Sequence, residues 1–296
     1  MWVYHVKGDC MKNWDFCIGN VGIHFEAEDT EQVAFEKLRF RKKCPESDVC
    51  LKFHVVDEIA VPKGIKCEKS TEEHPVWRDD SRISRVSWDF FREKPHFRTD
   101  YDLMQPNILD CYIRLEDLEW AKSEKYLWTG IALPSILLHH QHLIFHASYI
   151  EHHENGIIFT APSGTGKSTQ ADLWAKYRGA QILNGDKACV EVSKNPVVHG
   201  IPFEGTSGIC HDRSLPLKCI VYLSQAKENS ITSLTAVQAI RALFENVFVD
   251  RAVVEEWNRA FELLIQLVER VPVFHLACTT DERAVEILEQ AMNQIG

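Results

Sequence analysis

The sequence predicts an α/β protein in two parts, a smaller β-rich domain at residues 1–125 and an α/β domain at residues 126–296. Short runs of alternating apolar and polar residues recur in the first part, as expected for half-buried strands. In the second part, an apolar run leads directly into a glycine-containing turn and then into a helical segment. The C-terminal third contains apolar residues at three- and four-residue spacing, which is typical of amphipathic helices.

The composition is that of a soluble globular protein, with 45% hydrophobic and 26% charged residues in 296. A formal net charge of −10 argues against nucleic acid or an anionic membrane as a partner and leaves a basic peptide open. Residues 1–7 lack the apolar region of a signal peptide, and the apolar run at 131–138 is too short to span a bilayer. We therefore expect a cytoplasmic protein.

Ten cysteines are many for a chain of this length, but no two of them form a C-x-x-C pair. The sequence therefore predicts no zinc framework of the finger or ribbon type. Without an export signal, we expect reduced thiols with structural roles.

The first 125 residues carry the strand signals of an accessory domain. Strands are expected at 18–26, 49–56, 83–90 and 111–115, and loops at the proline-rich, charged stretches 62–82 and 93–106. No carboxylate pair or histidine cluster in this region has metal or catalytic spacing. The region is interpreted as an accessory β domain, either purely structural or involved in substrate docking.

The strongest motif is the stretch 161–169, which reads A-P-S-G-T-G-K-S-T. It lies between an apolar run at 156–160 and a helical run at 170–177, which is the context of a phosphate-binding P-loop. Ala161 replaces the first glycine of the pattern G-x-x-x-x-G-K-[ST]. We expect the extra methyl group to be tolerated, because residues 163–168 form the cradle itself.

The glycines of this loop allow a tight turn whose backbone N–H groups can surround phosphate oxygens, and the following helix N-terminus adds further donors. Lys167 is expected to reach the β- and γ-phosphates of ATP, and Ser168 to offer its hydroxyl to Mg²⁺. The nucleotide-binding residues predicted from the motif are Ser163, Gly164, Thr165, Gly166, Lys167, Ser168 and Thr169.

A histidine-rich stretch precedes this motif. It contains His139, His140, His142, His146, His152 and His153. No carboxylate or cysteine partners them at ligand spacing, so a metal site is not favoured here. His146 lies on an apolar run, 143–150, expected to form a hairpin with the strand before the loop. This pairing would bring His146 near the phosphate site, although a buried structural histidine is the simpler reading of the residue alone.

Two acidic residues beyond the loop are candidates for the site. The first part of the stretch 181–192 is predicted to be a short strand with Asp186 at its end, where this residue could hold Mg²⁺ or accept the proton of an attacking hydroxyl. A turn aspartate without function is the alternative. Glu204 lies in the small-residue segment 203–208 and is a candidate for an outer, supporting acid; a plain connecting loop is equally compatible with this segment.

The remaining elements are expected to form the core. Strands are predicted at 217–223 and 271–276, and helices at 123–138, 236–248, 252–268 and 281–292. Gly179 is expected to end the helix that follows the loop.

Residues from about 125 to 296 resemble the catalytic domain of HPr kinase/phosphorylase. The resemblance rests on His146 one hairpin before the loop, on the loop itself, on Gly185-Asp186 where the family has a double aspartate, and on the segment 203–208. The chain looks closer still to the HPr-kinase-like enzymes that phosphorylate a serine of peptide natural-product precursors such as lasso peptides. Phosphoenolpyruvate carboxykinase shares this fold family and a similar loop.

The resemblance implies an HPr-kinase/PEP-carboxykinase-like P-loop domain that binds ATP and Mg²⁺ and transfers the γ-phosphoryl group to a Ser or Thr of a protein or peptide. It implies that Asp186 is the catalytic base and that His146 lies at the active site. A small-molecule kinase, a carboxykinase-like enzyme and an ATP-binding regulator without turnover remain open. Homo-oligomerisation also remains open.

Overall fold

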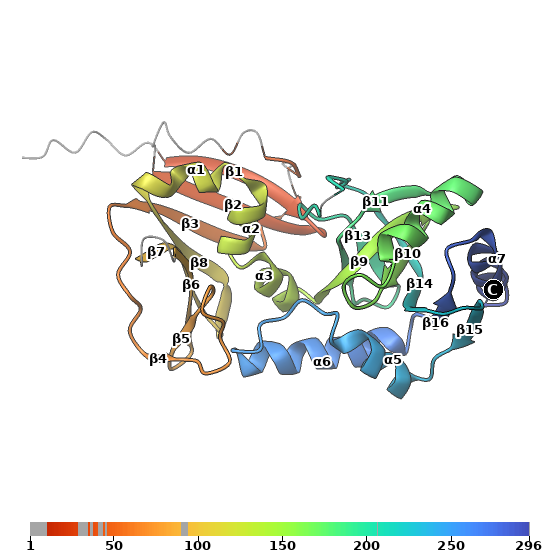
Figure 1. The fold of residues 1–296 in the computed structure, drawn as a ribbon. Coiled ribbons are helices and arrows are strands. Elements are labelled where there is room, and N and C mark those ends of the chain that lie inside the picture. The colour runs from red at the N-terminus through yellow and green to blue at the C-terminus, as the bar shows by residue number, and fades with distance from the viewer. Residues whose placement is uncertain are drawn as a thin grey trace, which may run out of the picture. The chain divides into compact units, whose positions relative to one another are not determined.

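The computed structural model describes residues 11–28, 35, 38–40, 44, 46–89, 94–205 and 207–295. The chain forms two compact units, Met1–Ile136 and Leu137–Gly296, each with its own sheet (Figure 1). The domain boundary expected after residue 125 falls within the helical segment that precedes this division. Among the described residues, no helix is both long enough and apolar enough to cross a membrane.

The N-terminal unit is built on an eight-stranded sheet with the order β1-β2-β3-β8-β7-β6-β5-β4. The β2–β3 and β3–β8 pairs are parallel and the other pairs are antiparallel. The strands are β1 Met11–Ile18, β2 Val21–Glu28, β3 Val49–Val56, β4 Ile65–Lys66, β5 Val76–Asp79, β6 Arg82–Asp89, β7 Lys94–Asp102 and β8 Gln105–Arg114. The helices α1 Leu118–Ala121 and α2 Glu124–Gly130 follow the last strand.

Aromatic side chains fill the core of this unit. Trp128 of α2 is fully buried and packs edge-on against Phe16, with ring centroids 5.4 Å apart. Phe25 and Phe35 extend this cluster at a centroid distance of 5.2 Å. Gly130 ends α2 against Phe97, where a Cβ would come within 2.9 Å of the ring. The close approach of α2 to the sheet therefore requires a glycine at this position.

Two of the expected loops in this unit contain strands. The stretch 93–106 includes β7, and the stretch 62–82 includes β4 and β5, so both loop assignments were wrong. In β7 the charged residues alternate with buried ones and point to the other face, while the buried Asp100 is neutralised by Arg82 and Arg98 at 2.9 and 2.5 Å. The many charged residues of this stretch therefore led to its assignment as a loop, although it contains an ordinary strand. The strand expected at 18–26 is interrupted by the turn at 19–20 that separates β1 from β2.

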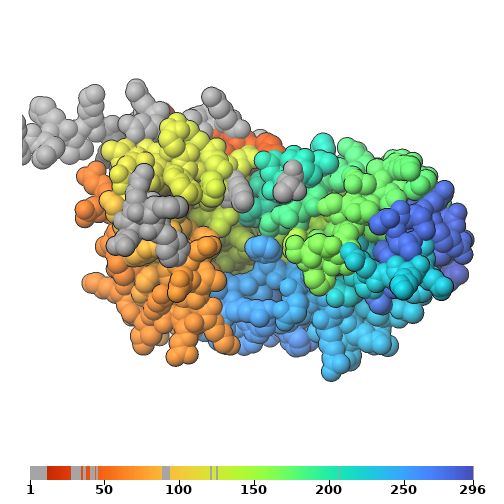
Figure 2. All heavy atoms as spheres, viewed as in Figure 1, coloured from red at the N-terminus to blue at the C-terminus, as the bar shows by residue number. Residues whose placement is uncertain are grey.

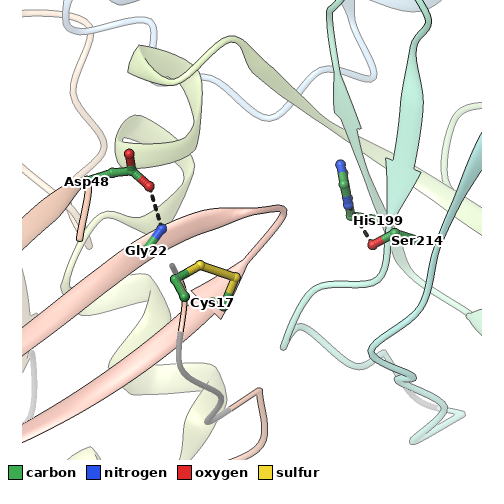
Figure 3. Close-up of a disulfide and its surroundings, with 6 residues drawn as sticks. Cys17, Gly22, Asp48, His199 and Ser214 are labelled. Carbon is green, nitrogen blue, oxygen red and sulfur yellow. Dashed lines mark hydrogen bonds between the residues drawn. A yellow bond between two sulfur atoms is a disulfide. The ribbon is translucent and has the colours of Figure 1, made fainter. Parts of the chain in front are cut away.

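One pair of cysteines in the N-terminal unit differs from the expectation of reduced thiols, whereas Cys50, Cys67 and Cys111 are thiols. Cys17, in β1, forms a disulfide with Cys44 (Figure 3). Nearby, the Asp48 carboxylate accepts a hydrogen bond from the backbone N–H of Gly22 at 2.7 Å. The cross-link therefore ties the end of β1 to the segment that enters β3, a long-range pairing that cysteine spacing alone could not reveal.

The C-terminal unit contains a second eight-stranded sheet, whose strands β10, β14 and β16 run parallel to one another. The other pairings are antiparallel. The strands are β9 His142–His152, β10 Asn155–Thr160, β11 Gln181–Asn184, β12 Lys187–Glu191, β13 Val197–His199, β14 Ser214–Gln225, β15 Ser230–Ser233 and β16 Val273–Cys278. The helices are α3 Leu133–His139, which crosses the division between the units, α4 Lys167–Arg178, α5 Ala236–Phe244, α6 Val254–Val268 and α7 Glu282–Asn293.

Helices cover both faces of this sheet. On one face, α5 and α6 pack on β9 residues such as Phe145 and Tyr149. On the other face, α4 and α7 pack on Ile150 and on Phe159 of β10. Arg178 of α4 pairs with Glu289 of α7 at 2.9 Å, and the two helices adjoin at the surface (Figure 2). Alternate residues of β9 and β10 therefore belong to different cores, as the two-residue period of a strand requires.

Most elements expected in this half are present, with several differences, one of which is the unexpected strand β12. The helix expected at 123–138 is two helices, α2 and α3, because Ala132 between them has a left-handed φ of 58°. The helix expected to reach residue 248 ends with α5 at Phe244. The short strand β15 lies in a polar stretch and was not expected.

Candidate functional site

The glycine loop at 161–169 connects β10 to α4 at the carboxyl end of a parallel strand. Gly164 and Gly166 have φ values of 77° and 122°, in the region that disfavours other residues. Apart from the flanking residues, no atom of the described part of the chain lies within 4 Å of the position that a Cβ would take at either glycine. Helix α4 begins at Lys167 without a side-chain cap, so its first N–H groups lack a capping side chain. The expected strand–turn–helix unit is confirmed, and open space adjoins the loop.

Two sets of hydrogen bonds hold the loop. The backbone N–H and the hydroxyl of Thr165 donate to the carbonyl of Pro162 at 3.3 and 2.9 Å. The side-chain amide of Gln225, at the end of β14, donates to the carbonyls of Gly164 and Thr165 at 3.4 and 3.3 Å. Gln225 was not identified from the sequence, because a glutamine after an apolar strand carries no motif.

Lys167 is the buried charge of the loop, with 7% of its surface exposed. Its Nζ donates to the carbonyl of Ala161 at 3.1 Å. Burial lowers the pKa of Lys167 from its usual range, and the charge of Asp186 acts in the opposite direction. An anion bound at the loop would therefore stabilise the charged form of Lys167. Ser163, Ser168 and Thr169 are exposed beside it.

The structure brings His146 and Asp186 together. His146 Nε2 lies 3.6 Å from Asp186 Oδ1, and the Nζ of Lys187 lies 2.5 Å from Asp186 Oδ2. The direct pairing of His146 with Lys187 across β9 and β12 produces this arrangement. Thr160, at the end of β10, donates its hydroxyl to the carbonyl of His146 at 2.9 Å, which links the histidine strand to the start of the loop.

The protonation of His146 is biased by its surroundings. Burial lowers its pKa from the ordinary value of 6.5, and the positive charges of Lys167 and Lys187 act in the same direction. The carboxylate of Asp186 acts against them. His146 is therefore neutral at pH 7, with a lone pair available as a hydrogen-bond or proton acceptor.

Asn184 fixes the turn that presents Asp186. Its buried side-chain oxygen accepts hydrogen bonds from the backbone N–H groups of Asp186 and Lys187, both at 2.9 Å. Its amide nitrogen donates to the carbonyls of Ile201 and Phe203 at 3.3 and 2.9 Å. The first two hydrogen bonds close the turn at 184–187, and the other two join it to the segment after β13. This role could not be predicted from the sequence, because asparagine is common in any turn.

The segment 203–208 lies beside this turn. A Cβ on Gly205 would come within 2.7 Å of the Asp186 Cβ, so the backbone here touches the acidic side chain. The Phe203 ring lies 5.2 Å from the Nζ of Lys187. Glu204 is exposed, and its supporting role stays a prediction. Thr206 lies outside the described residues.

The fold and the site define a mixed α/β protein with two sheets, the second of which carries a glycine loop between a parallel strand and a helix. Residues 123–293, more than half of the chain, match the family model described as SynChlorMet cassette protein ScmC. The chain therefore belongs to the ScmC family.

Among solved structures, this chain is similar to the HPr(Ser) kinase/phosphatase from Coxiella burnetii at 11% sequence identity and a TM-score of 0.31. The match covers 52% of this chain and 99% of that one. No curated protein matches the chain.

Proposed function

We propose that this protein is a Mg²⁺-ATP-dependent kinase that transfers the γ-phosphoryl group to a Ser or Thr hydroxyl of a protein or peptide. The observation that carries the proposal is the convergence of a buried lysine in a glycine loop, Lys167, with the pair His146–Asp186. The proposal is supported by the charges of these groups: Lys167 lowers the pKa of His146, and Asp186 raises the pKa of Lys167. A phosphoryl-transfer site needs these elements, since its catalysis depends mainly on positioning and charge stabilisation.

The residues of the loop fit the phosphates of a nucleoside triphosphate. Gly164 and Gly166 leave room for oxygens against the backbone, and the uncapped start of α4 offers N–H donors and partial positive charge. Lys167 turns from the carbonyl of Ala161 to the phosphates when they bind. Ser168 and Asp186 would hold Mg²⁺, which would supply positive charge against the transferred group.

Asp186 orients the acceptor hydroxyl or removes its proton. Lys187 and the Asn184 turn hold the carboxylate in place. The neutral His146 accepts a hydrogen bond without adding charge. In this arrangement the oxygen of the acceptor attacks the γ-phosphorus, the bond to the β-phosphate oxygen breaks, and the acceptor proton passes to Asp186.

The test uses ATP labelled at the γ-phosphate, Mg²⁺ and the peptides or small proteins encoded beside this gene. Wild type is compared with Asp186→Asn, and with Asp172→Asn, an exposed aspartate of α4, as the matched control. We expect label on a Ser or Thr with wild type and the control, and a loss of at least 100-fold with Asp186→Asn at unchanged ATP affinity.

Other outcomes redirect the assignment. Transfer to small hydroxylated acceptors and to no peptide would identify a small-molecule kinase. Saturable ATP binding without transfer to any acceptor would indicate a nucleotide-dependent regulator. Loss of nucleotide binding in Asp186→Asn would make this residue chiefly a metal ligand.

A further inference from the structure

A second polar cluster lies on three neighbouring strands of the C-terminal sheet. His142 begins β9, Glu191 ends β12 and His199 ends β13. Glu191 pairs directly with His142, and His199 pairs directly with Cys189, two residues before Glu191. Direct cross-strand partners, and residues two apart on one strand, point to the same face of a sheet. The three polar side chains therefore share one face.

The residues between them confirm this orientation. Leu143, Val190 and Val198 alternate with the polar residues and belong to the core on the opposite face, under α5 and α6. The convergence of the cluster thus follows from strand register. Sequence spacing did not reveal it, because the partners of His142 come from strands far along the chain.

The distances in the cluster suit a metal ion. One ligand atom from each residue lies within 4.8 Å of the other two. His199 Nε2 is 3.4 Å from Glu191 Oε2, and the two imidazole rings have centroids 5.6 Å apart. Ligand atoms about 2.0–2.2 Å from a tetrahedral ion lie roughly 3.4 Å from each other. Small rotations of the side chains would therefore close the set around an ion.

Hydrogen bonds orient the two imidazoles as metal ligands. His142 Nδ1 lies 2.6 Å from the carbonyl of His140, and because a carbonyl only accepts, this nitrogen carries the proton. The lone pair of neutral His142 is therefore on Nε2. His199 Nδ1 lies 2.8 Å from Ser214 Oγ (Figure 3), while its Nε2 faces Glu191. Partners on the far nitrogen of a histidine are the usual second contact of a metal-bound imidazole.

We propose that His142, Glu191 and His199 bind a divalent transition-metal ion of the zinc type. Two imidazole nitrogens and one carboxylate oxygen suit such an ion, whereas Mg²⁺ and Ca²⁺ prefer oxygen ligands throughout. The Glu191 side chain is 30% exposed, so a water molecule can complete the coordination from that side. The site lies on the β9 face that carries His146, four residues and about 13 Å along the strand, and is independent of the proposed kinase chemistry.

The experiment uses the full chain after treatment with a chelator, without nucleotide or Mg²⁺. Co²⁺ is titrated as a spectroscopic probe, and bound Zn²⁺ is quantified by elemental analysis after dialysis. We expect one equivalent of metal, the visible absorption bands of four-coordinate Co²⁺, and a higher melting temperature with Zn²⁺. Glu191→Gln and His199→Gln should weaken binding at least tenfold.

Two controls separate this site from others. His153→Gln removes an exposed histidine whose ring is tilted against that of His152, with centroids 4.0 Å apart, and it should leave binding unchanged. Asp186→Asn should also leave binding unchanged. Glu191→Gln retains both imidazoles, so its metal-free melting curve tests whether the fold is intact.

Three outcomes would overturn the proposal: no stoichiometric binding by wild type, wild-type affinity in both Glu191→Gln and His199→Gln, or loss of binding in Asp186→Asn. In the first two cases the His199–Glu191 contact is a structural hydrogen bond. In the third the metal binds at the glycine-loop site.

Discussion

His146 Nε2 lies 3.6 Å from Oδ1 of Asp186, although His146 lies on β9 and Asp186 lies in the turn between β11 and β12, beyond the glycine loop and its helix in the sequence. This contact places a neutral imidazole and a carboxylate beside the buried Lys167. The proposed chemistry depends on these three side chains, each of which makes its own contribution.

Lys167→Ala should reduce phosphoryl transfer by at least 100-fold, because it removes the buried positive charge that would stabilise the transferred group. The measurement is the initial rate of labelled phosphate transfer at saturating ATP. Lys176→Ala, at an exposed position of the same helix, is the matched control and should keep the wild-type rate. Near-normal turnover of Lys167→Ala would rule out the assigned role.

The pH dependence of transfer should reflect His146. Its pKa is lowered below 6.5 by burial and by the nearby lysines, so the imidazole is neutral above that value and gains a proton only in more acidic solution. We expect kcat/KM to be unaffected by His146 ionisation above pH 6.5 and to fall below it. His146→Gln cannot take up this proton and should lose that part of the acid limb. An identical acid limb in wild type and His146→Gln would contradict the prediction.

The lowered pKa of His146 also makes the stability of the folded protein depend on pH. The unfolded chain binds the His146 proton at a higher pH than the folded chain, so this residue favours unfolding as the pH falls through 6.5 towards the folded pKa. Wild type should therefore lose more stability than His146→Gln between pH 7 and pH 5. Thermal melts across this range measure the difference.

Asn184→Ala should lower the free energy of unfolding by about 2–4 kcal/mol, because it removes four hydrogen bonds and leaves buried backbone groups unpaired. The transfer rate of the folded fraction should fall as well, since the turn carrying Asp186 loosens. Asn195→Ala, at an exposed position after β12, should change stability by less than about 0.5 kcal/mol. Equal denaturant midpoints for the two variants would exclude the positioning role.

Gly205→Ala should reduce transfer while leaving ATP affinity unchanged. The new Cβ would lie 2.7 Å from the Cβ of Asp186 and displace that side chain, but the glycine loop is not touched. Isothermal titration with ATP and the labelled-phosphate assay separate the two effects. A parallel loss of binding and turnover would show instead that the segment 203–208 supports the nucleotide.

The Cys17–Cys44 disulfide should be detectable as a cross-linked peptide in a non-reducing digest. Its removal by Cys17→Ser with Cys44→Ser should lower stability by about 3 kcal/mol, because the unfolded chain regains the entropy of a loop spanning 27 positions. Complete alkylation of both thiols in unfolded, unreduced protein would exclude the cross-link.

The sequence predicted those features that are local. The order β10, glycine loop and α4 follows from an apolar run, two glycines and a helical run that are contiguous, and Gly179 ends the helix in the left-handed conformation, with a φ of 65°. The amphipathic helices α6 and α7 were placed within two residues at each end, because their apolar period spans several turns.

Features that depend on contacts between residues far apart in the chain could not be predicted from the sequence. Asn184 looks like any turn residue until its four partners are known, and Gln225 reaches the loop from the end of β14, which pairs with β10 but lies about 60 residues further along the chain. The strand β7 was taken for a loop because its charges, which point away from the core or pair with one another, outnumber its apolar residues. The partners of His142 are set by the register of β9, β12 and β13, which no short spacing encodes.

The long strand β9 presents His142 and His146 on one face and Leu143 and Phe145 on the other. Insertion or deletion of a single residue within β9 would exchange the two faces downstream of the change, so that polar side chains would enter the core under α5 and α6 and apolar ones would leave it. Both histidines stay on the same face only if the number of residues between them changes by an even number. An odd change would require a bulge that restores the alternation.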